Sequence, residues 1–273
     1  MRHFLLDLIH FEHHHTGVRT KEKLLQLIDE MNLNEKILSL TTDNDATMVL
    51  CGKNMTTEFG ETWNDKEFQH FQCAAHVLNI AINHGMQLRT EIIDKVRTFV
   101  NKIHYSTILC DALRSYCKVI KKDYLKPDLD VTTRWNSTFL MLEKFKRMHE
   151  ELDFLVCSNK QLETFYLNEN EWNQVQSMIV LLELMYKATK ILSSSSYPTV
   201  SDIRLTFTGI LRHIEIYIDD HILEESIMAD SIRKKIDDYW KILDSSTTIS
   251  TILNPSSKLL TFPFGEQRDK AIN

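Results

Sequence analysis

The sequence has little glycine, little proline and no long hydrophobic run. Only 6 Gly and 4 Pro occur among 273 residues. Because these residue types end helices and form tight turns, their scarcity favours long uninterrupted helices. No run of about eighteen apolar residues occurs, so we expect no membrane-spanning helix. The apolar run from Phe4 to Phe11 is broken by Asp7 and His10 and has no small-residue cleavage site, so we expect no signal peptide.

Paired cysteines and an excess of positive charge are also missing. The five cysteines are odd in number and scattered, which favours a reducing compartment over a disulfide framework. The 32 Lys and Arg residues stand against 38 Asp and Glu, for a net charge of −6. Since affinity for nucleic acid depends on cations that neutralise phosphates, this balance excludes a surface that is basic all round.

A local basic face is still compatible with this balance. Its candidate cations are Lys118, Lys121, Lys122, Lys126, Arg134, Lys144, Lys146 and Arg147. Clusters of this kind are more often solvated faces of helices.

The first part of the chain combines short strands with helices. Apolar runs at residues 3–11 and 36–42 predict buried strands, with a helix as the alternative for the first run. The periodic apolar residues of 20–31 predict a helix between them, which gives a βαβ-like unit. After Asp43 we expect a helix that Gly52 ends.

The rest of the chain is mainly helical in pattern. Residues 68–72 predict a connector or a short strand. Apolar spacing of three and four residues predicts helices over 74–86, 92–103, 109–116, 142–155, 169–192, 202–218 and 225–243. We expect Asn136 or Ser137 to cap the fourth of these, and the β-branched run at 249–253 to form a strand that returns to the early sheet.

Asp43 is the first candidate for chemistry. It ends a predicted strand, where a carboxylate can reach a divalent cation that is still open to substrate. Aspartate at the end of a strand is just as typical of a helix N-cap or a turn. The residue pattern alone leaves both interpretations open.

Cys73 and His76 form a second candidate site. Their C-x-x-H spacing can place two ligands on one zinc ion. The further ligands would come from His13, His14, His15 and His70. A buried thiol and a hydrogen-bonded histidine that pack the junction between two parts of the fold are the alternative, and we favour it.

Five segments, taken in order, carry a resemblance to a known family. They are Thr41-Thr42-Asp43-Asn44, Cys73-Ala74-Ala75-His76-Val77-Leu78-Asn79, Thr133-Arg134-Trp135-Asn136-Ser137, Tyr197-Pro198-Thr199, and Ile249-Ser250-Thr251-Ile252-Leu253-Asn254-Pro255 with Lys258. Each segment alone is unspecific, but their order and spacing together resemble the transposases of the hAT superfamily. They are most similar to the ricesleeper-like branch, whose members carry a BED zinc finger.

The resemblance implies an α/β fold that is mostly helical overall. A partial ribonuclease-H-like core would be interrupted by a large all-α insertion. On this basis we expect a partial core over residues 1–72, the helical insertion over 73–245, and an incomplete return toward the core over 246–273.

The resemblance also implies a chemistry and a role for each site residue. Family members use three carboxylates that hold two Mg²⁺ or Mn²⁺ ions for cutting DNA, and Asp43 matches the second carboxylate. The first and third would lie before and after this sequence, so we expect a transposase-derived fragment that binds no cofactor and cuts no DNA. Cys73 and His76 would shape the active site.

Arg134 and Trp135 would contact DNA in such a protein. The guanidinium would meet a phosphate and the indole would stack on an unpaired base, although a core aromatic with an arginine beside it is an equal alternative. We therefore expect weak DNA binding and, from the resemblance, a nuclear location, although no strong basic import signal is present.

A protein-interaction module is the alternative function. Its helical surface or an open sheet edge would bind a full-length relative or another protein. We expect no membrane contact. We also expect no oligomer without the dimerisation region that the family has near its C-terminus.

Overall fold

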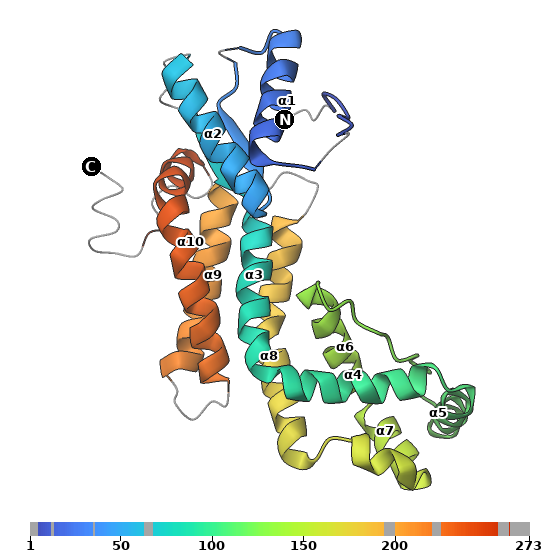
Figure 1. The fold of residues 1–273 in the computed structure, drawn as a ribbon. Coiled ribbons are helices and arrows are strands. Elements are labelled where there is room, and N and C mark those ends of the chain that lie inside the picture. Colours follow the sequence, from blue (N-terminus) through green and yellow to red (C-terminus); the bar gives the residue numbers. More distant parts are fainter. Residues whose placement is uncertain are drawn as a thin grey trace. The chain divides into compact units, whose positions relative to one another are not determined.

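The structure is a computed structural model that describes residues 5–11, 14–34, 36–62, 68–193, 200–219, 225–255 and 262. It is mostly helical, with one small sheet of two strands in the described residues (Figure 1). The chain divides into two compact units. The first extends from Met1 to Val77, and the second contains Leu78–Ser194 and the chain from Val200 onward.

The first unit is built on a βαβ motif. Its elements are α1 (Gly17–Glu30), β1 (Ser39–Thr42), α2 (Ala46–Thr62), β2 (Gln69–Gln72) and the start of α3 (Ala74–Met86). The strands β1 and β2 pair in parallel, with Thr42 opposite Gln72. Because the strands are parallel, their carboxyl ends meet at the same edge of the sheet.

A small apolar core holds this unit together. Its buried members are Ile28, Cys51, Met55, Phe59 and Phe68. The rings of Phe59 on α2 and Phe68 beside β2 stack with centroids 4.1 Å apart. The helix α2 packs against both strands, and α1 packs against α2. The helix that the pattern of 20–31 predicted is therefore present as α1.

The predicted strand over 3–11 is wrong for the residues that the structure describes. Residues 5–11 have no regular structure, and Leu5 and Leu8 are 86% and 88% exposed. A strand needs a hydrogen-bonded neighbour, and β1 and β2 pair only with each other among the described residues. The βαβ unit is therefore β1–α2–β2 and begins at Ser39.

Gly52 does not end a helix, contrary to the sequence prediction. It lies inside α2, which continues to Thr62. Its hydrogen faces the ring of His70 on β2, and a Cβ built at this position would lie only 2.2 Å from His70 Cγ. The glycine thus serves a close approach between helix and strand.

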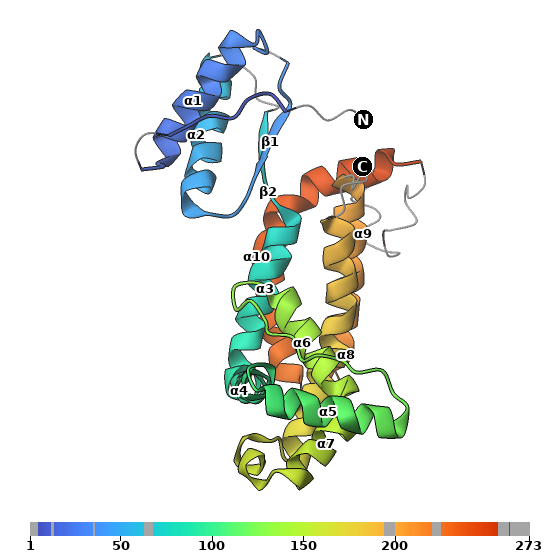
Figure 2. The same ribbon diagram turned by 90° about the vertical axis from the view of Figure 1, so that its right-hand side faces the viewer.

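The second unit is all helical within its described residues. Its helices are the remainder of α3, α4 (Thr90–His104), α5 (Thr107–Ile120), α6 (Trp135–Arg147), α7 (His149–Ser158), α8 (Glu169–Leu192), α9 (Val200–Asp219) and α10 (Ser226–Leu253), with short 3₁₀ helices at Gln87–Arg89 and Lys160–Phe165. The helix α9 packs against both α8 and α10, and α5 packs against α4 and α7 (Figures 1 and 2).

Several helix predictions are confirmed. The helices α3 and α8 have the predicted bounds, and α4 and α5 contain the predicted ranges 92–103 and 109–116. The hydroxyl oxygen of Ser106 accepts the N–H of Leu109 and caps α5. At the start of α8, Asn168 and Glu171 form a capping box. The buried side chains of this unit include Met141, Met148, Met178 and Met185.

Two other helix predictions need correction. The predicted helix over 142–155 is divided at Met148 into α6 and α7. Neither Asn136 nor Ser137 is the cap, because α6 already begins at Trp135. The Ser137 hydroxyl instead joins the preceding loop, where it accepts the N–H of Val131 at 2.8 Å.

The predicted strand over 249–253 is also wrong, because these residues form the last turns of α10. Thr247 and Thr251 are fully buried there, and the Thr251 hydroxyl donates to the Thr247 carbonyl at 2.6 Å. Burial of one face of the helix thus overrides the strand preference of β-branched residues. The division into 1–72, 73–245 and 246–273 stays a prediction.

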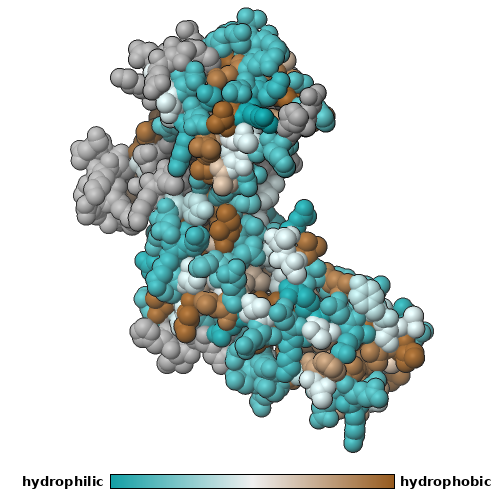
Figure 3. Space-filling model, in the orientation of Figure 1, coloured by the Kyte–Doolittle hydropathy of each residue, from teal (hydrophilic) through white to brown (hydrophobic). Residues whose placement is uncertain are grey.

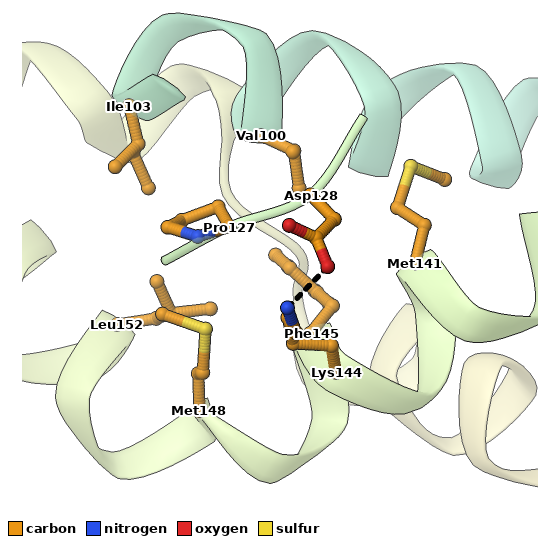
Figure 4. A pocket seen from close by; sticks show the side chains of 9 residues that line it. All are labelled: Val100, Ile103, Pro127, Asp128, Met141, Lys144, Phe145, Met148 and Leu152. Atoms are coloured by element: carbon orange, nitrogen blue, oxygen red, sulfur yellow. Dashed lines mark hydrogen bonds and ion pairs between the residues drawn. The ribbon is translucent and has the colours of Figure 1, made fainter. Parts of the chain in front are cut away.

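A cavity of about 10 Å³ lies under the loop between α5 and α6 (Figure 4). Its lining is mostly apolar and comes from Val100, Ile103, Pro127, Asp128, Met141, Lys144, Phe145, Met148 and Leu152. An ion pair between Lys144 and Asp128 lies beside it. The space suffices for one water molecule at most, so it is a packing defect rather than a ligand site.

None of the helices in the described ranges combines the length and apolar character that crossing a lipid bilayer requires.

Candidate functional site

Asp43 and Cys73 lie at the same edge of the β1–β2 sheet. Asp43 directly follows Thr42, and Cys73 directly follows Gln72, the residue paired with Thr42. The N–H of Cys73 donates to the carbonyl of Thr42 at 2.7 Å, which fixes the two chain segments side by side. The structure therefore brings together two of the sequence-predicted site residues in the first unit.

The Asp43 side chain is exposed at this edge. One of its carboxylate oxygens accepts the N–H of Asp45 at 3.3 Å. Next to it, both polar atoms of the Asn44 side chain are buried without a hydrogen-bond partner in the described structure. A carboxylate beside an unsatisfied amide is a polar site with unused hydrogen-bonding capacity.

Asp45 has a structural role. Its carboxylate accepts the N–H of Thr47 at 2.8 Å at the first turn of α2. This bond from the Thr47 backbone lowers the pKa of Asp45, because it stabilises the charged form. The helix-capping role that sequence patterns attach to aspartate thus belongs to Asp45, while Asp43 accepts the N–H of Asp45 in the turn before the helix.

His70 is a partly buried histidine that links the two strands rather than a free ligand. Its Nε2 lies 2.8 Å from the Thr42 hydroxyl, and its ring packs on Gly52. Burial lowers the pKa of His70, so the neutral ring is favoured. This bridge between the strands was not predicted from the sequence, where His70 was only one of several zinc-ligand candidates.

The geometry gives no support for zinc at Cys73 and His76. Both residues are half-buried, and His76 lies in the first turn of α3. Within the described residues no group of three or more His, Cys, Asp and Glu side chains is placed to hold a metal ion. Of the other candidates, His14 and His15 are exposed and His13 is outside the described residues.

The same edge does not fit a two-metal centre. Two divalent ions bound side by side need several carboxylates to hold and bridge them. Among the described residues, Asp43 is not part of any acid or histidine group of that size. One carboxylate leaves the coordination of both ions open, so no step of DNA cleavage can be derived from this chain.

Trp135 is a core residue of the second unit. It is 1% exposed and packs against Phe139 on its own helix and Tyr186 on α8, with ring centroids 6.2 and 6.4 Å away. Its Nε1 is buried without a hydrogen-bond partner among the described residues. Stacking on a base would require the indole to leave this core.

Arg134, in contrast, is exposed at the start of α6. Its guanidinium makes no ion pair or hydrogen bond with the described part of the chain. Thr132 and Thr133 beside it are exposed too. A free guanidinium next to the N–H groups at the start of a helix is a favourable arrangement for a phosphate.

A buried ion pair holds the loop that precedes Arg134. The Asp130 side chain is 2% exposed, and its oxygens accept hydrogen bonds from Arg97 on α4 at 2.8 and 2.6 Å and from Thr138 on α6 at 2.7 Å. Burial alone would raise the pKa of Asp130, but the bonds from Arg97 and Thr138 outweigh it and hold the pKa below its ordinary value. This clamp was not predicted from the sequence, because nothing in the pattern links residues so far apart.

The candidate basic face is partly neutralised. Lys122 pairs with Glu150 and, at 3.3 Å, with Glu151. Lys144 pairs with Asp128. These two cations therefore fit the alternative of a solvated helix face. Arg134 is not part of either ion pair.

Comparison with known proteins identifies similar sequences over nearly the whole chain. The family model of the ZBED1 RNase-like helical domain matches residues 71–181. A Zea mays protein named "Putative AC transposase" is 24% identical over 270 residues, which cover 95% of this chain and 33% of that protein.

Two further relatives come from rice and a fungus. "Zinc finger BED domain-containing protein RICESLEEPER 2" of Oryza sativa subsp. japonica is 22% identical over 274 residues, with 92% of this chain and 35% of that protein covered. "Putative transcriptional regulator tpeD" of Talaromyces stipitatus is 25% identical over 301 residues, with 97% of this chain and 33% of that protein covered. The chain thus spans about a third of the length of these curated relatives.

The relatives confirm the resemblance that the five segments predicted. They include transposases and ricesleeper BED proteins, and the matched family model describes an RNase-like helical domain. These findings are consistent with the hAT transposase family. The matched residues 71–181 begin at the candidate edge and cover Arg134 and Trp135.

Proposed function

From its similarity to hAT transposases and BED proteins, we propose that this chain is a transposase-derived domain that contacts DNA through its helical unit and does not cut DNA on its own. The contact is made by Arg134 with a DNA phosphate. Asp43 is the second carboxylate of an ancestral catalytic centre. As a DNA-binding derivative of a transposase, the protein acts in the nucleus.

The geometry of β1 and β2 supports the proposal that Asp43 belonged to a catalytic centre. The two strands are parallel, are joined through α2, and present Asp43 and Cys73 at their carboxyl edge. Open α/β sheets use this edge to bind ligands. We propose that β1, α2 and β2 are part of a ribonuclease-H-like core, and that Cys73 and His76 shape its edge by packing.

The proposed DNA contact rests on the difference in exposure between Arg134 and Trp135. The indole anchors the first turn of α6 in the core, and the guanidinium beside it is exposed and unpaired within the described residues. The Asp130 clamp fixes the preceding loop. Trp135 therefore positions the arginine and does not itself stack on a base.

Fluorescence anisotropy on duplex and hairpin DNA at rising salt concentration tests the contact. We expect weak binding at low salt that falls as salt rises, and Arg134→Ala should reduce the slope of log K against log salt by about 0.9, the value of one phosphate contact. Arg212→Ala is the matched control, because Arg212 is an exposed arginine on α9 that is not among the candidate cations of the basic face. Equal effects of the two substitutions, or no binding at low salt, would refute the contact.

The same complexes, supplied with Mn²⁺, test the absence of cleavage. A single carboxylate cannot fix the two ions that in-line displacement requires. We expect no metal-dependent nicks with either the wild-type chain or Asp43→Ala. Nicks by the wild-type chain that disappear in Asp43→Ala but persist in Asp7→Ala, an exposed acid elsewhere in the first unit, would show that Asp43 still works in a complete centre.

A further inference from the structure

A second cation lies near Arg134, in the last turn of α8. Lys190 is exposed and has no acidic partner among the described residues. Its ammonium lies over the ring of Tyr186, with Nζ 4.4 Å from the ring centroid. Because helical side chains point toward the N-terminus, the ammonium lies at the level of Tyr186 and away from the carbonyl end of α8. A lysine that rests on an aromatic face in this way still has N–H groups to donate to an anion.

Tyr186 connects this lysine to the start of α6. Its ring packs edge-on against Trp135, with centroids 6.4 Å apart, and against Phe139 at 4.9 Å. Trp135 is the first residue of α6 and directly follows Arg134. The two helices pack against each other, and α8 continues beyond the level of Tyr186 to Leu192 (Figure 1). A single aromatic ring therefore lies between the ammonium of Lys190 and the residue that follows Arg134.

The acids on the neighbouring elements are paired or distant. On α8, Glu183 pairs with Lys187 at 2.6 Å, and the other acids of this helix lie in its first turn. On α6, Glu143 lies more than two turns from the start of the helix. In the loop before α6, Asp130 is buried and pairs with Arg97. These acids therefore leave the two cations without a neutralising partner.

The helix α9, with Asp202 in its first turn, packs on the far side of α8 from Lys190. The Leu181 carbonyl of α8 lies 3.1 Å from Nε2 of His213 on α9. Leu181 and Lys190 are nine residues apart, which is two and a half helical turns, so they lie on opposite sides of α8. The side that carries Lys190 is the side on which Tyr186 meets α6.

We propose that Lys190 makes a second phosphate contact next to that of Arg134, so that α6 and α8 together bind the DNA backbone at two phosphates. This inference rests on the proposed function, because it extends the same contact. Phosphates repeat about every 3.4 Å along the axis of one strand, so two cations separated by one ring can meet different phosphates of one duplex. Figure 3 shows a mainly hydrophilic surface around α4 and α6, which suits a polar backbone.

The two cations contribute differently to the contact. The planar guanidinium of Arg134 can bind two oxygens of one phosphate, whereas the ammonium of Lys190 acts as a point charge. Neither contact reads a base, because phosphate contacts carry no sequence information. We therefore expect this pair of cations to bind duplexes of different sequence equally well.

Salt titration of duplex binding by the full chain, followed by fluorescence anisotropy, tests the second contact. Lys190→Ala should reduce the slope of log K against log salt by about 0.9, and the double variant with Arg134→Ala should reduce it by about 1.8, because each cation meets its own phosphate. Lys190→Arg keeps the charge and should keep the slope. Lys160→Ala, which removes an exposed lysine on the 3₁₀ helix Lys160–Phe165, is the matched control and should leave the slope unchanged.

The outcomes separate this inference from the proposed function. If Arg134→Ala reduces the slope but Lys190→Ala has no more effect than Lys160→Ala, the second contact is wrong and the proposed function stands. The same holds if the double variant loses no more than Arg134→Ala alone. If the wild-type chain binds no DNA at low salt, both are wrong. Circular dichroism verifies that each variant is folded, so that a lost contact is not confused with a lost fold.

Discussion

At the scale of single residues, His70 on β2 contacts both β1 and α2. Its ring is held by the Thr42 hydroxyl on one side and lies against the backbone of Gly52 on the other. The helix can approach the sheet this closely only because residue 52 has no side chain. One glycine thus sets the distance between α2 and β2, the strand that ends directly before Cys73.

Gly52→Ala is expected to destabilise the first unit by about 1–3 kcal/mol, because the new methyl group overlaps a ring that cannot move without breaking its bond to Thr42. Gly60→Ala in the same helix is the matched control. A Cβ there meets no atom within 4 Å, so this substitution should stabilise by about 0.5–1 kcal/mol through helix propensity. Urea unfolding of both variants measures the difference. Effects of the same sign would contradict the close approach.

Site residues differed in how well the sequence predicted them. The position of Asp43 was predictable because the predicted strand over 36–42 ends directly before it, and the structure places it directly after β1. The contacts of Gly52 with His70 and of Arg97 with Asp130 could not be predicted from the sequence. These residues are distant along the chain and come together only when it folds. For Trp135 the sequence left two interpretations open, and burial supports the structural one.

At the scale of elements, α10 shows that the strand preference of β-branched residues does not by itself determine secondary structure. Its last residues are β-branched and read as a strand, yet they continue a helix whose buried face includes Thr247 and Thr251. The bounds of α3 and α8 were predictable because their apolar residues repeat with the helical period over many turns. A run of five residues has no such period, so its structure depends on what it packs against.

Ile249→Ala distinguishes the helix from the predicted strand. Ile249 is exposed on α10, so replacing it with the better helix former should leave stability unchanged or raise it by a few tenths of a kcal/mol. In a strand the same substitution would lower stability. Ile232→Ala, fully buried on the same helix, should cost about 2–5 kcal/mol and shows that the assay responds to α10. Thermal unfolding followed by circular dichroism is the measurement.

At the scale of the whole molecule, the two units differ in how much they bury. The first has a five-residue buried core and a sheet of two strands in its described residues, a size that is marginal by itself. In the second, α8 alone contributes eight buried residues.

Hydrogen exchange followed by mass spectrometry should resolve this difference. We expect amides of α2 around Cys51 and Met55 to exchange at least about tenfold faster than amides of α8 around Val175 and Met185, which corresponds to about 1.4 kcal/mol in opening free energy. Both segments are buried helices, so local exposure does not explain a difference between them. Equal protection of the two segments would mean that the units unfold as one.

The hydrogen bonds of Asp130 with Arg97 and Thr138 make the loop before Arg134 less stable at acid pH. Because the pKa of Asp130 is lower in the folded chain, its stabilising contribution is complete above its ordinary value of about 3.9 and is lost as the pH falls through the folded value. Protonation would then release the loop while α6 stays anchored by Trp135. Acid would thus weaken the proposed contact of Arg134 with DNA by a change in the protein, since the phosphates keep their charge.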